Sequence, residues 1–454
     1  MKLFRILSAL VLLLAVPALI FAAGAREPAD TDGPVRLVIW GAVPAESGPG
    51  QVVDNFNAQH DHIQAEYVRY VNNDEGNARL DTALLAGEHI DIFISYAPSR
   101  REQRVEGGFA LDMSELLGQF DMSLAALFGD GVESAYTRAD GSVYSIPTNN
   151  QIQVILANKD ALESIGVDLP IEPGTWSWDD YRDISVRLVE EAGFEYGSFH
   201  NFEHFMIDHW VRTSTVRRDQ WIDENGQRSR WLEEPLLERS LVWFYDMMHE
   251  YQAQPTLETI ISDGLQGQNA AMLLGGRVGM MADGLHRLRD VRNLAEYPRD
   301  FQVTILPVPS ADTSGPYAAP IVTGDEFKIN SNSRNPEAAM EFIRWYITEG
   351  FGPMIVGGRT PLYSGYPVDQ VLEGISVDDT LPDGRDVLDM DSYLNVVLAE
   401  YSDIIVPGPD TARSEIGTIV REELEGYFLR LQSLDETLQS LHERTQSALD
   451  RANN

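Results

Sequence analysis

Strand-like and helix-like segments alternate along the first hundred residues, and this alternation constrains the fold more than any other feature. The runs VRLVIWG (35–41), IQAEYVRYV (63–71) and IDIFIS (90–95) have the apolar, β-branched character of buried strands. The segments between them, QVVDNFNAQH and ARLDTALLAG, have the apolar spacing of helices, and the second ends at Gly87. Strands that alternate with helices build a mainly parallel sheet, so we predict the α/β class.

The alternation continues beyond these segments. DGSVYSIP predicts a turn and a short strand, QIQVILANKDALESIG a strand followed by a helix, and FQVTILPVP another strand. From about residue 178 to residue 250 the pattern is mostly helical and is interrupted by the Asn225-Gly226 turn, which suits a small hairpin. Two helical stretches are expected after Glu415.

The first 25 residues have the pattern of a cleaved secretory signal. Lys2 and Arg5 precede an apolar stretch that is broken by Pro17 and followed by Ala-Gly-Ala at residues 23–25. A permanent membrane anchor is the alternative, since the apolar run is close to spanning length. With residues 1–25 as a signal peptide, we expect an exported protein, periplasmic or extracellular. It should not be a lipoprotein, because the chain has no cysteine to carry a lipid.

Composition excludes several classes of function. Without cysteine there is no disulfide, thiolate metal site or cysteine nucleophile. The 71 acidic residues outnumber the 34 basic ones, for a formal net charge of −37, so nucleic acid and anionic membranes are poor partners. Lysine occurs only three times, at Lys2, Lys159 and Lys328. A GC-rich genome and adaptation to saline surroundings both explain this, and both stay open.

Enzyme signatures are missing from the sequence. It contains no G-x-S-x-G elbow, P-loop lysine motif, G-x-G-x-x-G turn or H-E-x-x-H pair. We therefore predict a protein that is not an enzyme and needs no cofactor. FHNFEHFMIDHW holds His200, Glu203, His204 and His209, and His200 and His204 would share one face of a helix. A structural role, contact with a solute and zinc binding are the three interpretations, and we predict no metal site.

Several motifs occur in the order found in one family. They are VRLVIWG, LDTALLAGEHIDIF, GGFALDMSEL, DGSVYSIP, ANKDALESIGVDLP followed by TWSWDDY, GRVGMMADG and NSRNPEAAMEFIRWYIT. Together they resemble the extracellular solute-binding proteins of ABC importers, in the sugar-binding branch that is similar to maltose-binding protein. The sequence departs from the family pattern at Ala157, where a tyrosine is usual, at Ile90, which replaces a proline, and in the missing lipobox cysteine.

The resemblance implies a two-lobed periplasmic-binding-protein fold of type II character, with discontinuous lobes, a hinge and a central ligand cleft. Residues 35–146 and 311–356 would form lobe 1, and residues 147–310 and 357–454 would form lobe 2. The chain would cross between the lobes near residues 146–147, 307–309 and 357–361, where prolines limit the hinge to few conformations.

Candidate cleft residues follow from the rule that ligands bind beyond the carboxyl ends of parallel strands. For Trp40 a place in the core is the alternative, and for Asp283 and Asn149 a helix cap or a turn. The predicted ligand-binding residues are Trp40, Glu46, Ser95, Tyr96, Asn149, Asn150, His200, Trp210, Asp283, Thr323, Asp325 and Arg359.

These residue types favour a sugar. Aromatic rings cover the C–H face of a pyranose, and amides and carboxylates match its hydroxyls. An anionic solute would need cations, of which only Arg359 and Arg100 are candidates. We therefore expect a monomeric carrier that delivers a sugar or oligosaccharide to the permease subunits of an ABC importer. A secreted carbohydrate-active enzyme and a module that presents its ligand to a membrane sensor are the alternatives.

Overall fold

The computed structural model describes residues 33–96, 98–138, 140–169, 171–200, 210–214, 221–315, 317–376, 379–399 and 411–453. Side chains are described for these residues except 98–101 and 322. Contacts divide the chain into Met1–Pro34 and one compact unit, Val35–Asn454. The predicted signal peptide, residues 1–25, lies outside the described residues.

The first sheet has four strands in the order β2-β1-β3-β9. β1 (Val35–Gly41) pairs in parallel with β2 (Ile63–Arg69) and with β3 (Ile92–Ser95), and β9 (Glu326–Ile329) adds an antiparallel edge. The three strands predicted near the amino end are therefore present. The third begins two residues later than expected, at Ile92, and Asp91 directly before it binds Val38 of β1 through both its amide (2.9 Å) and its carboxylate (2.9 Å).

Helices cover both faces of this sheet. α1 (Pro49–Gln59) packs against β2 and α14 (Pro336–Trp345) against β1, whereas α2 (Asp74–Ala86) follows β2 and ends at Gly87, which has a φ of +68°. The two faces of β1 carry different cores, since Leu37 and Ile39 belong to the large cluster and Val38 and Trp40 to a smaller one. This alternation is the two-residue period of a strand buried on both sides.

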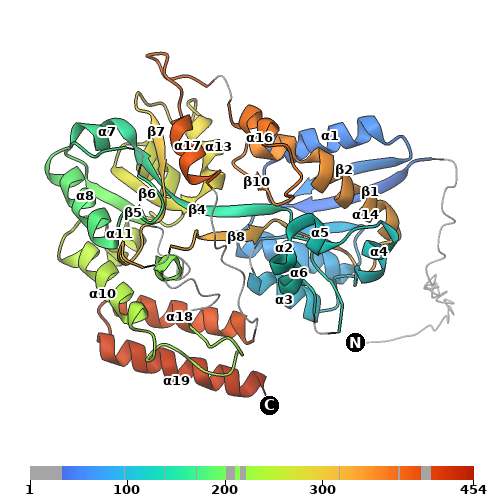
Figure 1. Ribbon diagram of the computed structural model, residues 1–454. Helices are drawn as coiled ribbons and strands as arrows, with labels where there is room; N and C mark the ends of the chain where they lie inside the picture. The colour runs from blue at the N-terminus through green and yellow to red at the C-terminus, as the bar shows by residue number, and fades with distance from the viewer. Residues whose placement is uncertain are drawn as a thin grey trace, which may run out of the picture. The chain divides into compact units, whose positions relative to one another are not determined.

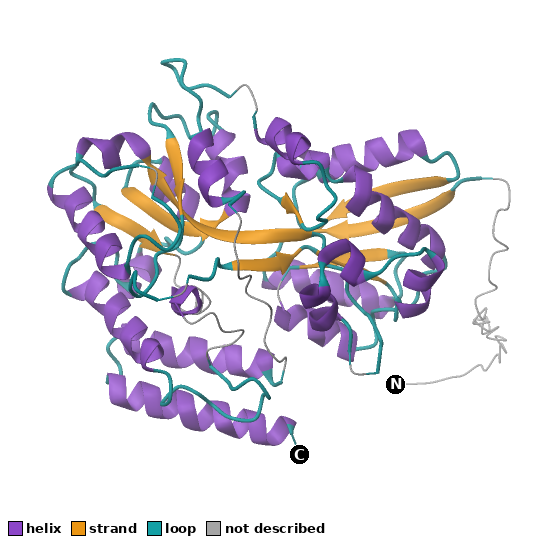
Figure 2. Cartoon of the chain, viewed as in Figure 1, coloured by secondary structure: helices purple, strands orange, loops and turns teal. Residues whose placement is uncertain are grey.

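The second sheet is built around one long strand, β4 (Asn149–Asn158). Its later residues pair antiparallel with β6 (Val278–Gly284) and β7 (Val303–Leu306), and its earlier residues with β8 (Ile321–Gly324) and β10 (Thr360–Pro361). In Figure 1, β4 runs from the group of β5, β6 and β7 toward the strands of the first sheet. Both sheets are flanked by helices, which gives the α/β class (Figure 2).

Two predictions for this region are wrong. The stretch expected to be mostly helical contains β5 (Tyr196–His200), which pairs in parallel with β6. His200 therefore ends a strand, and the helical face that was to join it to His204 is not formed at His200. DGSVYSIP makes only an isolated bridge, Ile146 to Phe327, in place of a strand. The Asn225-Gly226 turn does join an antiparallel bridge between Ile222 and Ser229.

Two helices lie where two helical stretches were predicted, and they form a hairpin. α18 (Arg413–Phe428) and α19 (Leu434–Ala452) pack on each other, and α19 also packs on α10 (Pro235–His249). No helix within the described ranges is long and apolar enough to cross a membrane. The remaining helices and helical turns are η1 (Ala45–Ser47), α3 (Pro98–Glu106), α4 (Ser114–Gln119), α5 (Leu124–Phe128), α6 (Asp130–Tyr136), α7 (Lys159–Ser164), α8 (Trp178–Glu190), α11 (Leu257–Ser262), α12 (Asn269–Leu274), η2 (Leu285–Arg287), α13 (Leu288–Arg292), η3 (Tyr346–Gly350), α15 (Gly352–Ile355), α16 (Val368–Ile375) and α17 (Met390–Val396).

Candidate functional site

Three segments that are far apart in the sequence meet where β4 begins. Asn149 lies opposite Gly324 of β8 and Pro361 of β10, and Asn150 lies opposite Thr323 and Thr360. We call this three-stranded part, β8-β4-β10, the crossing. It adjoins the predicted crossings near residues 146–147 and 357–361, and it brings together five of the predicted site residues: Asn149, Asn150, Thr323, Asp325 and Arg359.

A buried ion pair lies at the edge of the crossing. The Arg359 guanidinium donates from Nε to Oδ2 of Asp325, and the two side chains are only 8% and 3% exposed. Burial alone would lower the pKa of Arg359, but the Asp325 carboxylate raises it above its usual value, so Arg359 stays charged. The Thr323 hydroxyl is hydrogen-bonded to the Tyr136 hydroxyl, with 2.6 Å between the two oxygens.

Several buried polar atoms at the crossing have no hydrogen-bond partner among the described residues. They include Oδ1 of Asn149, Oδ1 of Asn150, Oδ1 of Asp325 and Nη1 of Arg359, and also Oε1 of Gln153, one residue beyond the part of β4 that pairs with β8. We call these five the unpaired crossing atoms. Buried polar groups in proteins are nearly always hydrogen-bonded, so each of these atoms needs an explanation. Four of the five atoms are acceptors.

Gly324 leaves room for an amide side chain of β4. A Cβ added at Gly324 would lie 2.5 Å from the Gln151 side chain, whereas one at Gly284 would lie 2.6 Å from Nδ1 of His286 and only in ordinary contact with Gln153. Gln151 and Gln153 share one face of β4 with Asn149, because side chains alternate along a strand. Sequence reasoning missed both glutamines, although the alternation in NNQIQ could have indicated a polar face.

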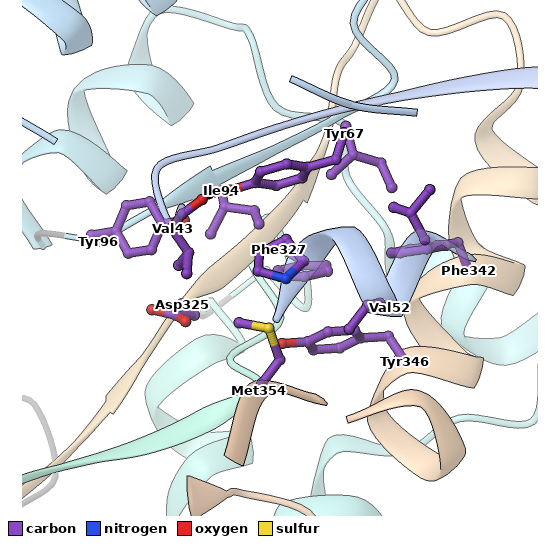
Figure 3. A pocket seen from close by; sticks show the side chains of 13 residues that line it. Val43, Val52, Tyr67, Ile94, Tyr96, Asp325, Phe327, Phe342, Tyr346 and Met354 are labelled. Carbon is purple, nitrogen blue, oxygen red and sulfur yellow. Dashed lines mark hydrogen bonds between the residues drawn. The ribbon is translucent and has the colours of Figure 1, made fainter. Parts of the chain in front are cut away.

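A small cavity connects the ion pair with the first sheet. It has a volume of about 20 Å³, enough for one water molecule, and its lining includes Tyr67, Tyr96 and Asp325. Figure 3 shows Tyr96 and Asp325 on the same side of this cavity, with Phe342 and Tyr346 opposite. The Tyr96 hydroxyl accepts a hydrogen bond from the Ala42 amide (2.8 Å), and burial raises the pKa of Tyr96.

Asp283 is the last residue but one of β6, and its carboxylate is held by neighbouring residues. It accepts hydrogen bonds from Asn269 Nδ2 (2.8 Å), Arg287 Nε (2.7 Å) and the Gly284 amide (2.7 Å). His286 Nε2 lies 3.7 Å from this carboxylate, and burial lowers the pKa of His286 to about 4. Asp283 thus lies within a strand, with its carboxylate held by these neighbours, and contact with a solute remains a prediction.

The other predicted site residues lie away from the crossing. Trp40 is buried in the smaller core with the Arg79 guanidinium 5.2 Å from its ring, and Glu46 is exposed on η1. Ser95 is buried at the end of β3, where its hydroxyl accepts a hydrogen bond from Arg104 (3.2 Å). For these residues, too, contact with a solute remains a prediction.

Trp210 and His200 lie in an aromatic cluster of the second sheet. Trp210 is fully buried, with its ring centroid 4.9 Å from that of Trp243 and 5.1 Å from that of His200. His200 Nε2 lies 3.1 Å from the Tyr181 hydroxyl, and burial lowers the pKa of His200 to about 3. The histidine is therefore neutral near pH 7.

A metal site was considered for the segment that contains His200. Its other possible ligands, Glu203, His204 and His209, lie outside the described residues. Within the described part of the chain, no group of three or more histidine, aspartate or glutamate side chains is arranged to hold a metal ion.

The chain matches known proteins along most of its length. The model of the family "Bacterial extracellular solute-binding protein" matches residues 43–352. The substrate-binding protein Lmo0181 of Listeria monocytogenes, solved with cycloalternan, has a TM-score of 0.72 and 15% identity, covering 92% of this chain and 99% of that one. Maltose-bound MalE3 of T. maritima has a TM-score of 0.71 and 16% identity, covering 91% and 99%. These likenesses show that the fold is the two-lobed α/β fold.

A sequence relative is known from Streptomyces antibioticus, an uncharacterized lipoprotein in the oleD 5′ region. It is 29% identical over 175 residues, which are 38% of this chain and 37% of the relative, so the match spans less than half of either protein. The family model, in contrast, covers more than half of this chain and includes β8 and the Asp325 region of the crossing. The chain belongs to the bacterial extracellular solute-binding protein family.

Proposed function

We propose that this protein captures a sugar or oligosaccharide at the crossing and delivers it to an ABC importer. The observation that carries the proposal is the set of unpaired crossing atoms. Buried acceptor oxygens of Asn149 and Gln153 on one face of β4, of Asn150 on the other face, and of Asp325 beside the strand require hydrogen-bond donors, and one guanidinium N–H requires an acceptor. A hydroxyl group supplies both a donor and an acceptor, so a polyhydroxylated solute fits this set.

Charge argues against an anionic solute. The Asp325 carboxylate already balances Arg359, and the remaining acceptor oxygens would face a carboxylate or phosphate with the wrong polarity. The solved relatives support the choice of a sugar, because their names state that they bind cycloalternan and maltose. Among the predicted aromatic residues, Tyr96 lines the same cavity as Asp325, so we propose that Tyr96 supplies the aromatic face.

A binding panel tests this function. The purified protein is melted with monosaccharides, maltose and longer oligosaccharides, and with amino acids and polyamines as controls. A ligand that binds only the native state increases the free energy of unfolding, by about 2.7 kcal/mol when its concentration is a hundred times its Kd. The melting temperature rises as a consequence. We expect sugars alone to raise it. A rise with amino acids or polyamines and none with any sugar would contradict the proposal.

We further propose that the protein is exported after removal of residues 1–25 and acts as a monomer with the permease subunits of the importer. We propose no lipid anchor, since no cysteine is present, although the Streptomyces relative carries the name of a lipoprotein. Mass spectrometry of the exported protein should show a new amino terminus near Arg26. An intact Met1 would instead indicate a membrane-tethered protein.

A noncatalytic role completes the proposal. The family is one of solute-binding proteins, and the crossing presents amides and an ion pair. Incubation of the protein with the sugar that binds best should leave that sugar unchanged by chromatography. Turnover would support the alternative of a carbohydrate-active enzyme.

A further inference from the structure

Between β8 and β9 the chain passes from the second sheet to the first, and a single residue joins the two strands. β8 ends at Gly324 and pairs with β4, and β9 begins at Glu326 and pairs with β3. Asp325 is the residue between them. Any movement of one sheet relative to the other therefore has to be accommodated at or next to its backbone.

Asp325 has an unusual backbone conformation. Its φ is +43°, in the left-handed region that side chains other than glycine rarely adopt, although aspartate and asparagine tolerate it better than most. A glycine at this position would accept the conformation without strain. The presence of aspartate at the strained position indicates that its carboxylate is needed there.

The side chain and the backbone of Asp325 connect the three strands of the crossing, β4, β8 and β10. Its carboxylate binds Arg359, which directly precedes β10, and its carbonyl oxygen accepts a hydrogen bond from the Thr148 hydroxyl (2.9 Å), directly before β4. Asp325 itself directly follows β8. One residue thus ties together the three places where the chain runs between the two sheets.

We propose that Asp325 is the pivot of lobe movement and that its ion pair with Arg359 sets the resting arrangement of the lobes. The pair also has an unpaired oxygen, Asp325 Oδ1, and an unpaired N–H, Arg359 Nη1, within the described structure. A solute hydroxyl that binds either atom weakens or reorients the contact that holds the pivot. Solute binding is in this way coupled to movement at one ion pair; this coupling rests on the proposed function, whereas the pivot itself does not.

Spin labels can measure the pivot without any ligand. The chain has no cysteine, so Leu85→Cys on α2 and Ile261→Cys on α11, both exposed, give one label on each side of the crossing. Pulsed electron resonance then reports the distribution of distances between the labels. The variants are Asp325→Gly, which frees the backbone, and Asp121→Gly as the matched control. Asp121 also has a positive φ, +52°, but lies exposed between α4 and α5.

A second pair of variants separates backbone from charge. Asp325→Gly alone leaves the buried Arg359 without a counter-charge, which can prevent folding. We therefore also compare Asp325→Gly with Asp325→Asn in an Arg359→Gln background. Both double variants lack both charges, and they differ in backbone freedom at residue 325, since asparagine tolerates the left-handed region less freely than glycine does.

We expect a broader distance distribution for Asp325→Gly than for the wild type, and no change for Asp121→Gly. In the Arg359→Gln background, the glycine variant should be broader than the asparagine variant. Equal widths for the two double variants, or equal broadening by Asp121→Gly, would overturn the pivot. Because all of these measurements use ligand-free protein, failure of the sugar panel would refute the proposed solute and leave this test unaffected.

Discussion

Two buried arginines in this protein have opposite surroundings. Arg104 on α3 is 2% exposed and donates to Asp81 (2.7 Å), Asn77 (2.8 Å) and Ser95 (3.2 Å). Arg359 is almost as buried, but its side chain binds Asp325 through Nε, and its Nη1 has no partner in the described structure. Both guanidinium groups lie near the first sheet, the first beside the end of β3 and the second where β9 begins.

The difference between the two arginines distinguishes a polar network that stabilises the fold from a set of polar groups that is available for binding. A network in which every group is paired holds one conformation, because any movement leaves buried groups unsatisfied. The Arg104 network fixes α2, α3 and the end of β3 in this way. The unpaired crossing atoms have no such constraint, so a solute or a rearrangement of the lobes can satisfy them.

The largest expected effect is the loss of the Arg104 network. Arg104→Leu leaves the half-buried Asp81 carboxylate and the buried Asn77 and Ser95 without their partner. Breaking a buried pair on one side costs about 3–5 kcal/mol, so urea denaturation should show a decrease in the free energy of unfolding of that order. Arg36→Leu, which breaks an exposed pair with Glu66, is the control and should cost less than about 1 kcal/mol. Similar losses for both variants would show that the Arg104 network does not stabilise the fold.

A matched pair of asparagines tests the same contrast at the level of binding. Asn77 is hydrogen-bonded to Arg104, to Asn72 and to the carbonyl of Asn73, whereas Oδ1 of Asn149 is one of the unpaired crossing atoms. Asn77→Leu should lower the free energy of unfolding by about 1–3 kcal/mol and leave sugar affinity unchanged.

Asn149→Leu should have the opposite profile. It removes an unpaired buried acceptor, so stability should stay the same or rise. Sugar affinity should fall about tenfold or more, which corresponds to a lost hydrogen bond of about 1–3 kcal/mol. Calorimetric titration and urea denaturation of both variants provide the comparison. A loss of stability without a loss of affinity in Asn149→Leu would place Asn149 among the structural residues.

His200 combines the features of Asn77 and Asn149, because one of its ring nitrogens has a hydrogen-bond partner and the other has none among the described residues. Its Nε2 contacts the Tyr181 hydroxyl, and its Nδ1 has no partner within the described ranges. Burial lowers its pKa from 6.5 in the unfolded chain to about 3, so below pH 6.5 the unfolded state binds a proton that the native state does not. The stability contributed by neutral His200 is complete above pH 6.5 and is lost toward pH 3, at about 1.4 kcal/mol per pH unit.

The variant His200→Phe removes this titration. Its stability, measured by urea denaturation between about pH 4 and pH 7, should fall less steeply with decreasing pH than that of the wild type. The aromatic cluster with Trp210 and Phe244 should accept the ring. Parallel pH profiles for the two proteins would mean that the pKa of His200 is the same in the native and the unfolded state.

The sequence predicted the strands whose pattern is local and missed those that depend on tertiary contacts. β1, β2 and β3 are apolar, β-branched runs, and this character is visible without any other part of the chain. β5 was missed because YGSFH is short and contains Gly197. A Cβ at Gly197 would lie 1.8 Å from the Ser185 carbonyl oxygen, so this strand forms through its fit against α8 and its pairing with β6.

The site was harder to predict for the same reason. Asp325 and Arg359 were both named as ligand-binding candidates, but no local pattern tells that they pair with each other, 34 residues apart, beside Asn149. The sequence also cannot separate a tryptophan in a core from one in a cleft. Trp210 is packed in an aromatic cluster, and that environment is created by Tyr181 and Trp243, which lie about 30 residues to either side.

The smallest expected effect concerns salt, and it sharpens the comparison by separating surface charge from buried charge. With a formal net charge of −37, repulsion between surface carboxylates should destabilise the folded state at low ionic strength. From about 0.01 M to 1 M sodium chloride the Debye length falls from about 30 Å to about 3 Å, so the melting temperature of the wild type should rise. Buried pairs are screened much less, and the difference in melting temperature between the wild type and Arg104→Leu should therefore stay constant across the series. If that difference shrinks as salt is added, the Arg104 network acts as a surface interaction, and the contrast with the crossing loses its physical basis.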